Sequence, residues 1–279
     1  MNRVPSIVFM SALFTSILPQ LHLPVIGFAV GTIIGLTGVG GGSLMTPILV
    51  GGLGIPPAIA VGTDLLFAAI TKSFGAVAHW RAGNVAKRLL IVLITASLTG
   101  AGLAFAVIHE VKPDIEALNR VIRVWLGIAL FATAFALLIR PLLLRLRLRR
   151  NHLARPSAGD LEANLWPTIT LGLIIGAVVT LSSVGAGAIG VTALLLLHPA
   201  LPLSRIVGTD IAYAVPLTAA AGLAHASVGH LDVTLLLALL LGSVPGILLG
   251  ARLSKRVPEL ATRSLLVAAL SFAGVKLVA

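Results

Sequence analysis

The sequence contains no cysteine and few charged residues. Without cysteine, the chain can form no disulfide, has no thiolate nucleophile and binds no metal through sulfur. Only 10% of the 279 residues are charged, whereas a soluble domain carries roughly 25%. Acidic residues are especially scarce, with 9 Asp and Glu against 20 Lys and Arg. This composition excludes an ordinary soluble domain.

Long apolar runs take up much of the chain instead. Hydrophobic residues make up 58% of the sequence, and the mean hydropathy is +1.08. The uncharged runs 89–108 and 233–251 are each long enough to cross a bilayer, which takes roughly 20 residues, and 165–204 exceeds one crossing. Because lipid offers backbone amides no partner, these segments should be helices. The sequence therefore predicts an all-α polytopic membrane protein.

The excess of basic residues falls in short stretches between the apolar runs. The stretch 140–155 holds six arginines, and 252–256 holds three basic residues. Such placement is typical of loops that anchor a membrane protein at the cytoplasmic face. No folded domain is available to present a basic face, so nucleic acid is not expected as a partner.

Two stretches of the chain match each other at a constant offset. VGTDLLFAAITKSFGAVAHWRAG (61–83) and VGTDIAYAVPLTAAAGLAHASVG (207–229) share Gly, Thr, Asp and His at equivalent positions. Upstream, the offset shifts by one residue, and the glycine-rich stretches 39–42 and 184–187 match. Such matches mean more than matches of Leu or Ala, which all membrane helices share. The chain therefore contains two homologous halves, as many transporters do.

Each half is predicted to contain a glycine-broken segment followed by three helices. We divide the chain into an N-terminal apolar segment (1–20), a first repeat (21–140), a basic cytoplasmic linker (141–164) and a second repeat (165–279). The predicted helical ranges are 22–53, 56–79, 86–108 and 120–140 in the first repeat, and 166–198, 202–226, 232–252 and 258–278 in the second. The run 5–19 resembles a signal-peptide core without a convincing cleavage site, so we expect an extra helix or a membrane anchor there.

The basic stretches also constrain the number of membrane crossings. Two helices, 202–226 and 232–252, separate the broken segment 166–198 from the basic stretch 252–256. Both basic stretches lie in the cytoplasm only if the broken segment crosses the membrane an even number of times. We therefore expect a hairpin that enters and leaves on the same side. A hairpin plus three helices makes an odd number of crossings, which predicts that the halves are inverted repeats.

The glycines of the two broken segments are candidate anion-binding residues. A turn at membrane depth leaves backbone N–H groups free, and glycine gives other groups access to them. A helix that begins after such a turn presents its N–H groups to an anion. The candidate substrate-binding residues are Gly38, Gly40, Gly41, Gly42, Ser43, Thr63, Ser183, Gly185, Gly187 and Thr209. Alternatively, the glycines only allow helices to pack closely.

Asp64 and Asp210 lie within apolar helices and are candidate coupling residues. A carboxylate inside the membrane is costly, so a functional role is the default interpretation, and either residue could carry a coupling proton. Alternatively, Thr and Asp simply cap the start of a regular helix. Lys72, about 12 Å from Asp64 along the helix, is the third candidate coupling residue, and it is either a substrate contact or a structural ion partner. His79 and His225, near helix ends, are expected to be interfacial and hydrogen-bonded.

The ordered set of motifs resembles a known family. GLTGVGGGSLMTPIL (35–49), AVGTDLLFAAITKSFGAVAHWRAGNV (60–85), VGTDIAYAVPLTAAAGLAHASVGHLD (207–232) and GSVPGILLGARLS (242–254) together are similar to the TauE/SafE sulfite exporter family. The resemblance covers the chain from about residue 21. It implies a bacterial inner-membrane carrier of sulfur oxyanions or organosulfonates whose two glycine turns form the site. Ala186 interrupts the second glycine run, so this chain departs from two equal turns.

We therefore predict a secondary transporter of a small anion, such as sulfite, thiosulfate or sulfoacetate, that works by alternating access. Membrane lipid surrounds it, protons are the expected coupling ion, and the sequence is compatible with a homo-oligomer. Two alternatives stay open: a cation-coupled carrier of another small anion, and an intramembrane enzyme that uses Asp64 and Asp210. No nucleophile motif and no metal-ligand spacing occurs, so neither enzyme activity nor a metal or cofactor is predicted.

Overall fold

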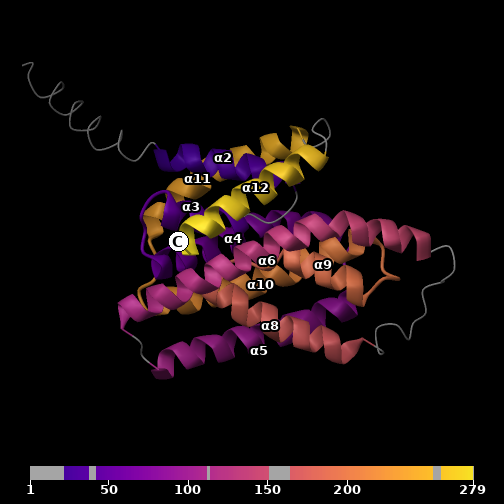
Figure 1. Cartoon of the computed structure of the whole chain (residues 1–279), viewed down its shortest axis with the longest axis horizontal. Coiled ribbons are helices and arrows are strands. Elements are labelled where there is room, and N and C mark those ends of the chain that lie inside the picture. The colour runs from indigo at the N-terminus through magenta and orange to yellow at the C-terminus, as the bar shows by residue number, and fades with distance from the viewer. Residues whose placement is uncertain (1–21, 38–41, 112–113, 151–163, 254–258, 279) are drawn as a thin grey trace, which may run out of the picture.

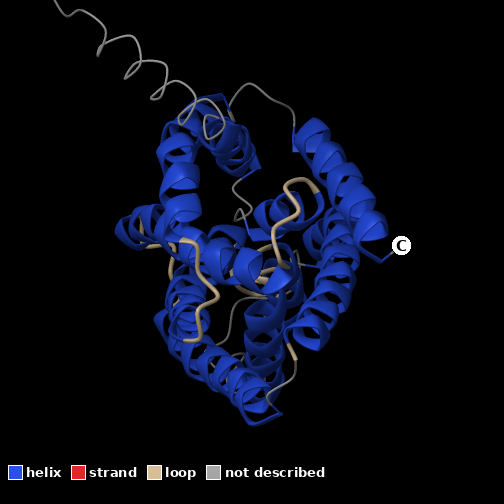
Figure 2. Ribbon diagram, turned by 90° about the vertical axis from the view of Figure 1, so that its left-hand side faces the viewer, coloured by secondary structure: helices blue, strands red, loops and turns tan. Residues whose placement is uncertain are grey.

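The computed structural model describes residues 22–37, 42–111, 114–150, 164–253 and 259–278. Figure 2 shows helices joined by short loops, without a strand in these ranges. The helices are α2 (His22–Thr37), α3 (Gly42–Gly51), α4 (Pro57–Arg81), α5 (Lys87–Val111), α6 (Ile115–Arg150), α8 (Leu165–Ser182), α9 (Ala188–Leu197), α10 (Leu203–Ser227), α11 (Val233–Leu253) and α12 (Glu259–Val278). The predicted all-α fold is confirmed.

Six of the described helices are long and apolar enough to cross a membrane, namely α4, α5, α6, α8, α10 and α11. The helix α6 runs from Ile115 to Arg150, past the predicted end at 140, so the first part of the predicted linker is helical. Leucine and arginine, which alternate there, are both good helix formers, and arginine is favourable at a helix C-terminus. The predicted N-terminal segment (1–20) and the rest of the linker lie outside the described residues, apart from Asn164.

Helices of the first half pack mainly against helices of the second half. The helix α2 packs along α11 at the top of Figure 1, and α5 packs along α8 at the bottom. In each pair, the first helix of one half lies on the penultimate helix of the other. The helices α4 and α10 pack together between these pairs, and α6 packs on α12. Equivalent helices of the halves thus have equivalent neighbours.

Glycines bring the backbones of the paired helices into direct contact. On α2, a Cβ added to Gly31 would lie 2.7 Å from Ser243 Cα of α11. On α11, a Cβ added to Gly246 would lie 3.0 Å from Thr32 N of α2. Gly27, Gly35, Gly242 and Gly250 repeat these contacts at intervals of four residues. These glycines let the paired helices approach closely, as small residues do in membrane proteins.

The central helices α4 and α10 run antiparallel and are joined by two matching hydrogen bonds. Near the start of α4, Thr63 Oγ1 accepts a bond of 3.1 Å from the N–H of Asp232, just after α10. Near the start of α10, Thr209 Oγ1 accepts a bond of 2.9 Å from the N–H of Ala86, just after α4. The sequence offset that pairs Thr63 with Thr209 also pairs Ala86 with Asp232. The two halves therefore meet through the same contact made twice, in opposite directions.

Candidate functional site

The break between α8 and α9 reverses the chain within the buried part of the protein. Ser183 adopts a left-handed conformation with φ 58°, and Gly185 and Gly187 have φ of 127° and 143°. Glycine accepts such angles because it has no Cβ. After the break, α9 runs back along α8. This is shown by the distance of 2.9 Å between Oγ1 of Thr168, in the first turn of α8, and Nε2 of His198, directly after α9. The second broken segment is thus a hairpin, as predicted.

The corresponding break of the first half lies mostly outside the described residues. This applies to the predicted site residues Gly38, Gly40 and Gly41, and also to the side chain of Ser43. Gly42 begins α3, so the chain enters a helix immediately after this break, as α9 begins at Ala188 after the second break.

Asp64 is held by the first turns of α3. Its Oδ2 accepts a hydrogen bond of 3.2 Å from the N–H of Thr46 and a second, short bond from the Thr46 hydroxyl. Both residues are fully buried. The Oδ1 atom of Asp64 has no hydrogen-bond partner, although Ser183 of the second break lies nearby. Asp64 therefore connects α4 to α3 and faces the break of the other half.

Asp210 has a different environment at the equivalent position. Its Oδ1 and the hydroxyl of Tyr213, one turn further along α10, are both buried, and the hydroxyl interacts with the Asp210 carboxylate, although neither atom forms a well-aligned hydrogen bond. Both atoms point at Gly190 in the first turn of α9, where any Cβ would overlap Asp210 Oδ1 and lie 2.9 Å from the Tyr213 hydroxyl. Arg140 of α6 contributes a positive charge that acts on Asp210. Burying polar atoms without well-formed hydrogen bonds is costly, and a ligand or a proton at this position would lower that cost for Asp210 and Tyr213.

Lys72 links the first half to the break of the second half. Its Nζ donates a hydrogen bond of 2.9 Å to the carbonyl oxygen of Ala186, between Gly185 and Gly187. It also interacts electrostatically with both Asp64 and Asp210. The side chain is buried, so its charge must be balanced within the protein. Lys72 thus lies where the carboxylates of both halves meet the break of the second half.

The helix-cap interpretation of the two Thr-Asp pairs is wrong. The helix α4 begins at Pro57 after Pro56, and α10 begins at Leu203 after Pro202, so Asp64 and Asp210 lie about two turns inside. The structure also places Thr63 and Thr209 at the contact between halves described above, with their hydroxyls already engaged. Ser183, Gly185, Asp64, Asp210 and Lys72 are brought together. Thr63 and Thr209 are not part of that cluster.

Removing either threonine hydroxyl should loosen the contact between the halves by a similar amount. Thr63→Val leaves the N–H of Asp232 without its acceptor, and Thr209→Val does the same to the N–H of Ala86. Because both donors are only partly buried, each variant should lower the free energy of unfolding by about 1 kcal/mol, the usual net contribution of such a hydrogen bond. Thermal unfolding of the purified protein in detergent measures this. Thr95→Val is a matched control, because that hydroxyl is exposed and bonds only its own helix. A loss as large in the control would contradict the inter-helix role.

Four residues of the site were not predicted from the sequence: Thr46, Arg140, Gly190 and Tyr213. Tyr213 is the single tyrosine of the chain and replaces Phe67 in the aligned repeat, which is a usable signal. Thr46 replaces Val191, and Gly190 replaces Met45, under the upstream offset. Positions at which the two repeats differ therefore indicate site residues, in addition to the positions at which they match.

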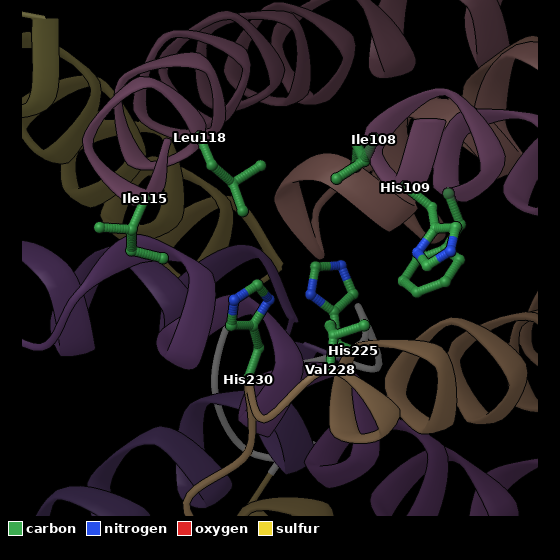
Figure 3. Close-up of a pocket in the computed structure, with 8 residues that line it drawn as sticks. Ile108, His109, Ile115, Leu118, His225, Val228 and His230 are labelled. Carbon is green, nitrogen blue, oxygen red and sulfur yellow. The ribbon is translucent and has the colours of Figure 1, made fainter. Parts of the chain in front are cut away.

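A separate cavity of about 220 Å³ lies at the end of α10 and contains three histidines. Figure 3 shows the rings of His225 and His230 side by side, facing a space between Ile115 and Leu118 on one side and His109 on the other. The Nε2 of His225 is 2.9 Å from the carbonyl oxygen of Thr180 and must donate to it. Burial lowers the pKa of His230, so this ring is mainly neutral at pH 7. His225 is thus hydrogen-bonded, as predicted, although its Nδ1 has no partner.

The comparisons with known proteins agree with this architecture. A family model described as sulfite exporter TauE/SafE matches residues 23–277. Probable membrane transporter protein YjnA of Bacillus subtilis (strain 168) is 39% identical over 259 residues, which cover 93% of this chain and all of YjnA. Probable membrane transporter protein YdhB of the same organism is 24% identical over 251 residues, covering 90% of this chain and 96% of YdhB.

No solved structure gives a significant match. The matched relatives carry transporter names, and the described helices are those of a multi-pass membrane protein. The family model covers nearly the whole of both halves, including the breaks, the aspartates and Lys72. The chain therefore belongs to the sulfite exporter TauE/SafE family and is a membrane transporter.

Proposed function

We propose that this protein is a secondary transporter that moves a small anion of the sulfur oxyanion or organosulfonate class across the bacterial inner membrane. Sulfite, thiosulfate and sulfoacetate are the candidate substrates. The anion binds between the two breaks, where Ser183, Gly185, Gly187 and Lys72 supply donors and positive charge. In the first break, Gly38, Gly40, Gly41, Gly42 and Ser43 are the proposed counterparts.

One observation carries this proposal: buried polar atoms without partners gather where one half meets the break of the other. The unpartnered atoms are Asp64 Oδ1, Ser183 Oγ, Asp210 Oδ1 and Tyr213 Oη. The cationic side chains of Lys72 and Arg140 act on the same place. A small anion would accept hydrogen bonds from the Ser183 and Tyr213 hydroxyls and a proton would satisfy a carboxylate oxygen, whereas an apolar ligand would satisfy none of these atoms. The family name adds the chemical class of the ion.

The antiparallel packing of α4 and α10 supports alternating access by inverted repeats. If both helices cross the membrane, the two-fold relation between them lies in the membrane plane. The two Thr-to-backbone contacts then lie near opposite faces, at Thr63 and at Thr209. When one contact opens and the other stays closed, the central cluster becomes accessible from one side of the membrane at a time. The central cluster consists of Asp64, Lys72, Ser183, Gly185 and Asp210.

Because the chain has no native cysteine, the inverted arrangement can be tested with single cysteines. Ala82 and Val228 occupy equivalent positions in the loops that follow α4 and α10, and both are exposed. Ala82→Cys and Val228→Cys should react with a membrane-impermeant maleimide from opposite sides of the membrane. Labelling of both variants from the same side would rule out inverted repeats.

The two carboxylates also favour one alternative, a carrier that couples another small anion to a cation. In that case, Asp64 and Asp210 bind the cation and the substrate need not contain sulfur. An intramembrane enzyme has less support, because the described part of the chain offers no group of metal ligands and no hydroxyl paired with a histidine base beside the aspartates.

Transport should be measured with the purified full chain in liposomes. Liposomes loaded with unlabelled thiosulfate or sulfoacetate should take up the labelled anion by exchange, with saturation and without ATP. Sulfite is run with protein-free liposomes beside it, since its neutral acid form leaks through lipid. Excess sulfate, chloride or acetate should compete poorly if the site selects the proposed class.

The result that rejects the proposal is equally direct. If none of the three sulfur anions exchanges above the level of protein-free liposomes, the protein is not a carrier of this class. Exchange that requires sodium and accepts acetate as well as thiosulfate would favour the cation-coupled alternative.

A further inference from the structure

We propose that the two equivalent aspartates have different jobs: Asp64 is a fixed structural partner of α3, and Asp210 alone is the carboxylate that gains and loses the coupling proton. This inference rests on the proposed transport function and divides a role that the repeat pattern assigns to both residues equally.

The hydrogen bonds of Asp64 belong to the framework. Its Oδ2 receives both the N–H and the hydroxyl of Thr46, and neither residue has any exposed surface. Two donors from one residue hold the carboxylate in a single place and tie α3 to α4. A carboxylate in this setting stabilises the fold through strong, charge-assisted bonds. Moving it would separate the two helices.

Asp210 has lost the equivalent partner. The position aligned with Thr46 is Val191, which has no hydroxyl. The position aligned with Met45 is Gly190, which leaves the adjacent space free of a side chain and lets Asp210 Oδ1 lie directly against the backbone of α9. On α9, the second half therefore lacks both the threonine hydroxyl and the bulk that fix the aspartate of the first half, and the hydroxyl that interacts with Asp210 comes from Tyr213 of its own helix.

The groups that surround Asp210 are suited to a changing charge. Tyr213, aligned with the apolar Phe67, adds a hydroxyl that interacts with the Asp210 carboxylate next to Gly190. Arg140 of α6 adds a positive charge that acts on Asp210 as well. Lys72 acts on Asp210 while donating to the carbonyl oxygen of Ala186 in the break. When Asp210 is charged, it competes with Ala186 for Lys72. When a proton from water neutralises it, Lys72 is free for the break and for an anion.

The proton therefore controls how strongly Lys72 is available at the break. Uptake of one proton by Asp210 on one side of the membrane favours anion binding there, and its release to water on the other side favours anion release. A change of charge at Asp64 would act on Lys72 less strongly, since the interaction of Lys72 with Asp210 is the larger of the two and Asp64 is already held by Thr46.

Matched asparagine variants in proteoliposomes test this division. Asp64→Asn keeps an amide oxygen that can accept both Thr46 donors, so the ratio of accumulation driven by a pH gradient to exchange of labelled thiosulfate should stay within about threefold of the wild-type ratio. Asp210→Asn should lower the same ratio of gradient-driven accumulation to exchange by at least about tenfold, because it removes the group that gains and loses the proton. If Asp64→Asn loses the response to the pH gradient as fully as Asp210→Asn, the inference is wrong.

A graft between the repeats provides a second arm. Val191→Thr places at Asp210 the hydroxyl that Thr46 gives Asp64, and it should reduce gradient-driven accumulation about tenfold or more by holding the carboxylate. The reverse change, Thr46→Val, should leave the response to the pH gradient intact. An unchanged response in Val191→Thr together with a lost response in Thr46→Val would overturn the proposal.

A stability measurement separates this inference from the transport function. Asp64→Ala should lower the melting temperature in detergent by at least about 5 °C more than Asp210→Ala, because only Asp64 loses hydrogen bonds to Thr46. Equal losses would reject the structural role of Asp64 whatever the protein transports. Failure of the wild type to exchange any sulfur anion would instead reject the proposed function and the coupling role of Asp210 with it.

Discussion

Replacing Gly100 with leucine should prevent α5 from packing on α8 and leave little folded protein. A Cβ at Gly100 would lie 2.8 Å from both Cα and the carbonyl carbon of Leu173, so any side chain meets backbone rather than a movable side chain. Gly176 of α8 approaches Ser97 of α5 in the same way, which leaves neither helix room to shift. We expect a loss of about 3 kcal/mol or more in the free energy of unfolding. Thermal unfolding and gel filtration in detergent measure it.

Gly102 is the matched control for this change. It lies two residues further along α5, and no atom of another residue lies within 4 Å of the place that its Cβ would take, so leucine there faces open surroundings. Gly102→Leu should therefore fold and exchange anions as the wild type does, with helix propensity slightly improved. Similar destabilisation by both variants would show that glycine serves the helix itself rather than the contact with α8.

Replacing Lys72 with methionine should abolish anion transport almost completely. Methionine keeps most of the volume but removes the charge that acts on both aspartates and the donor that bonds to Ala186. Removing one partner from a buried ionic group costs about 3–5 kcal/mol, which corresponds to a loss of more than about 100-fold in flux if the anion uses the same charge. Exchange of labelled thiosulfate, normalised to folded protein by gel filtration, is the measurement.

Lys276→Met separates this effect from a general loss of positive charge. Lys276 also donates to a backbone carbonyl, that of Gly51 at the end of α3, with a distance of 2.8 Å. Its side chain is exposed, however, and it lies outside the central cluster. Its replacement should change flux by no more than about twofold, as for most exposed charge interactions. Lys72→Arg keeps the charge, so recovery of flux in that variant would indicate that charge matters more than the shape of the lysine. Normal exchange in folded Lys72→Met would remove Lys72 from the binding site.

The elements of this protein are readable from its sequence because each leaves a local mark. Uncharged runs of bilayer length, helix-starting prolines such as Pro56 and Pro202, and the glycines at 185 and 187 all act within a few residues. The repeat then identifies Asp64 and Asp210 as special, since an acidic residue rarely recurs by chance in two apolar helices.

The partners of those residues are a tertiary property and leave no such mark. Nothing local indicates that Lys72 reaches the carbonyl of Ala186, which is 114 residues away in the chain, or that Thr46 folds back on Asp64. Thr63 and Thr209 also show that the sequence does not identify the tertiary partner of a residue, although here the repeat does mark the residues. They match in the repeat because both halves use them for one contact, and a match alone cannot tell a contact between halves from a contact with substrate.

The swapped contacts of Thr63 and Thr209 also bear on how such a protein can arise. Each half supplies one threonine hydroxyl that accepts a hydrogen bond from the other half, and one backbone N–H that donates to the threonine of the other half. If the halves are inverted in the membrane, as proposed, a half-length ancestor with a single copy of these residues would find a complementary surface on a second molecule inserted in the opposite orientation. Gene duplication and fusion of such a dual-topology dimer would preserve these contacts, and the arginine-rich stretch between the halves would then fix the orientation of both.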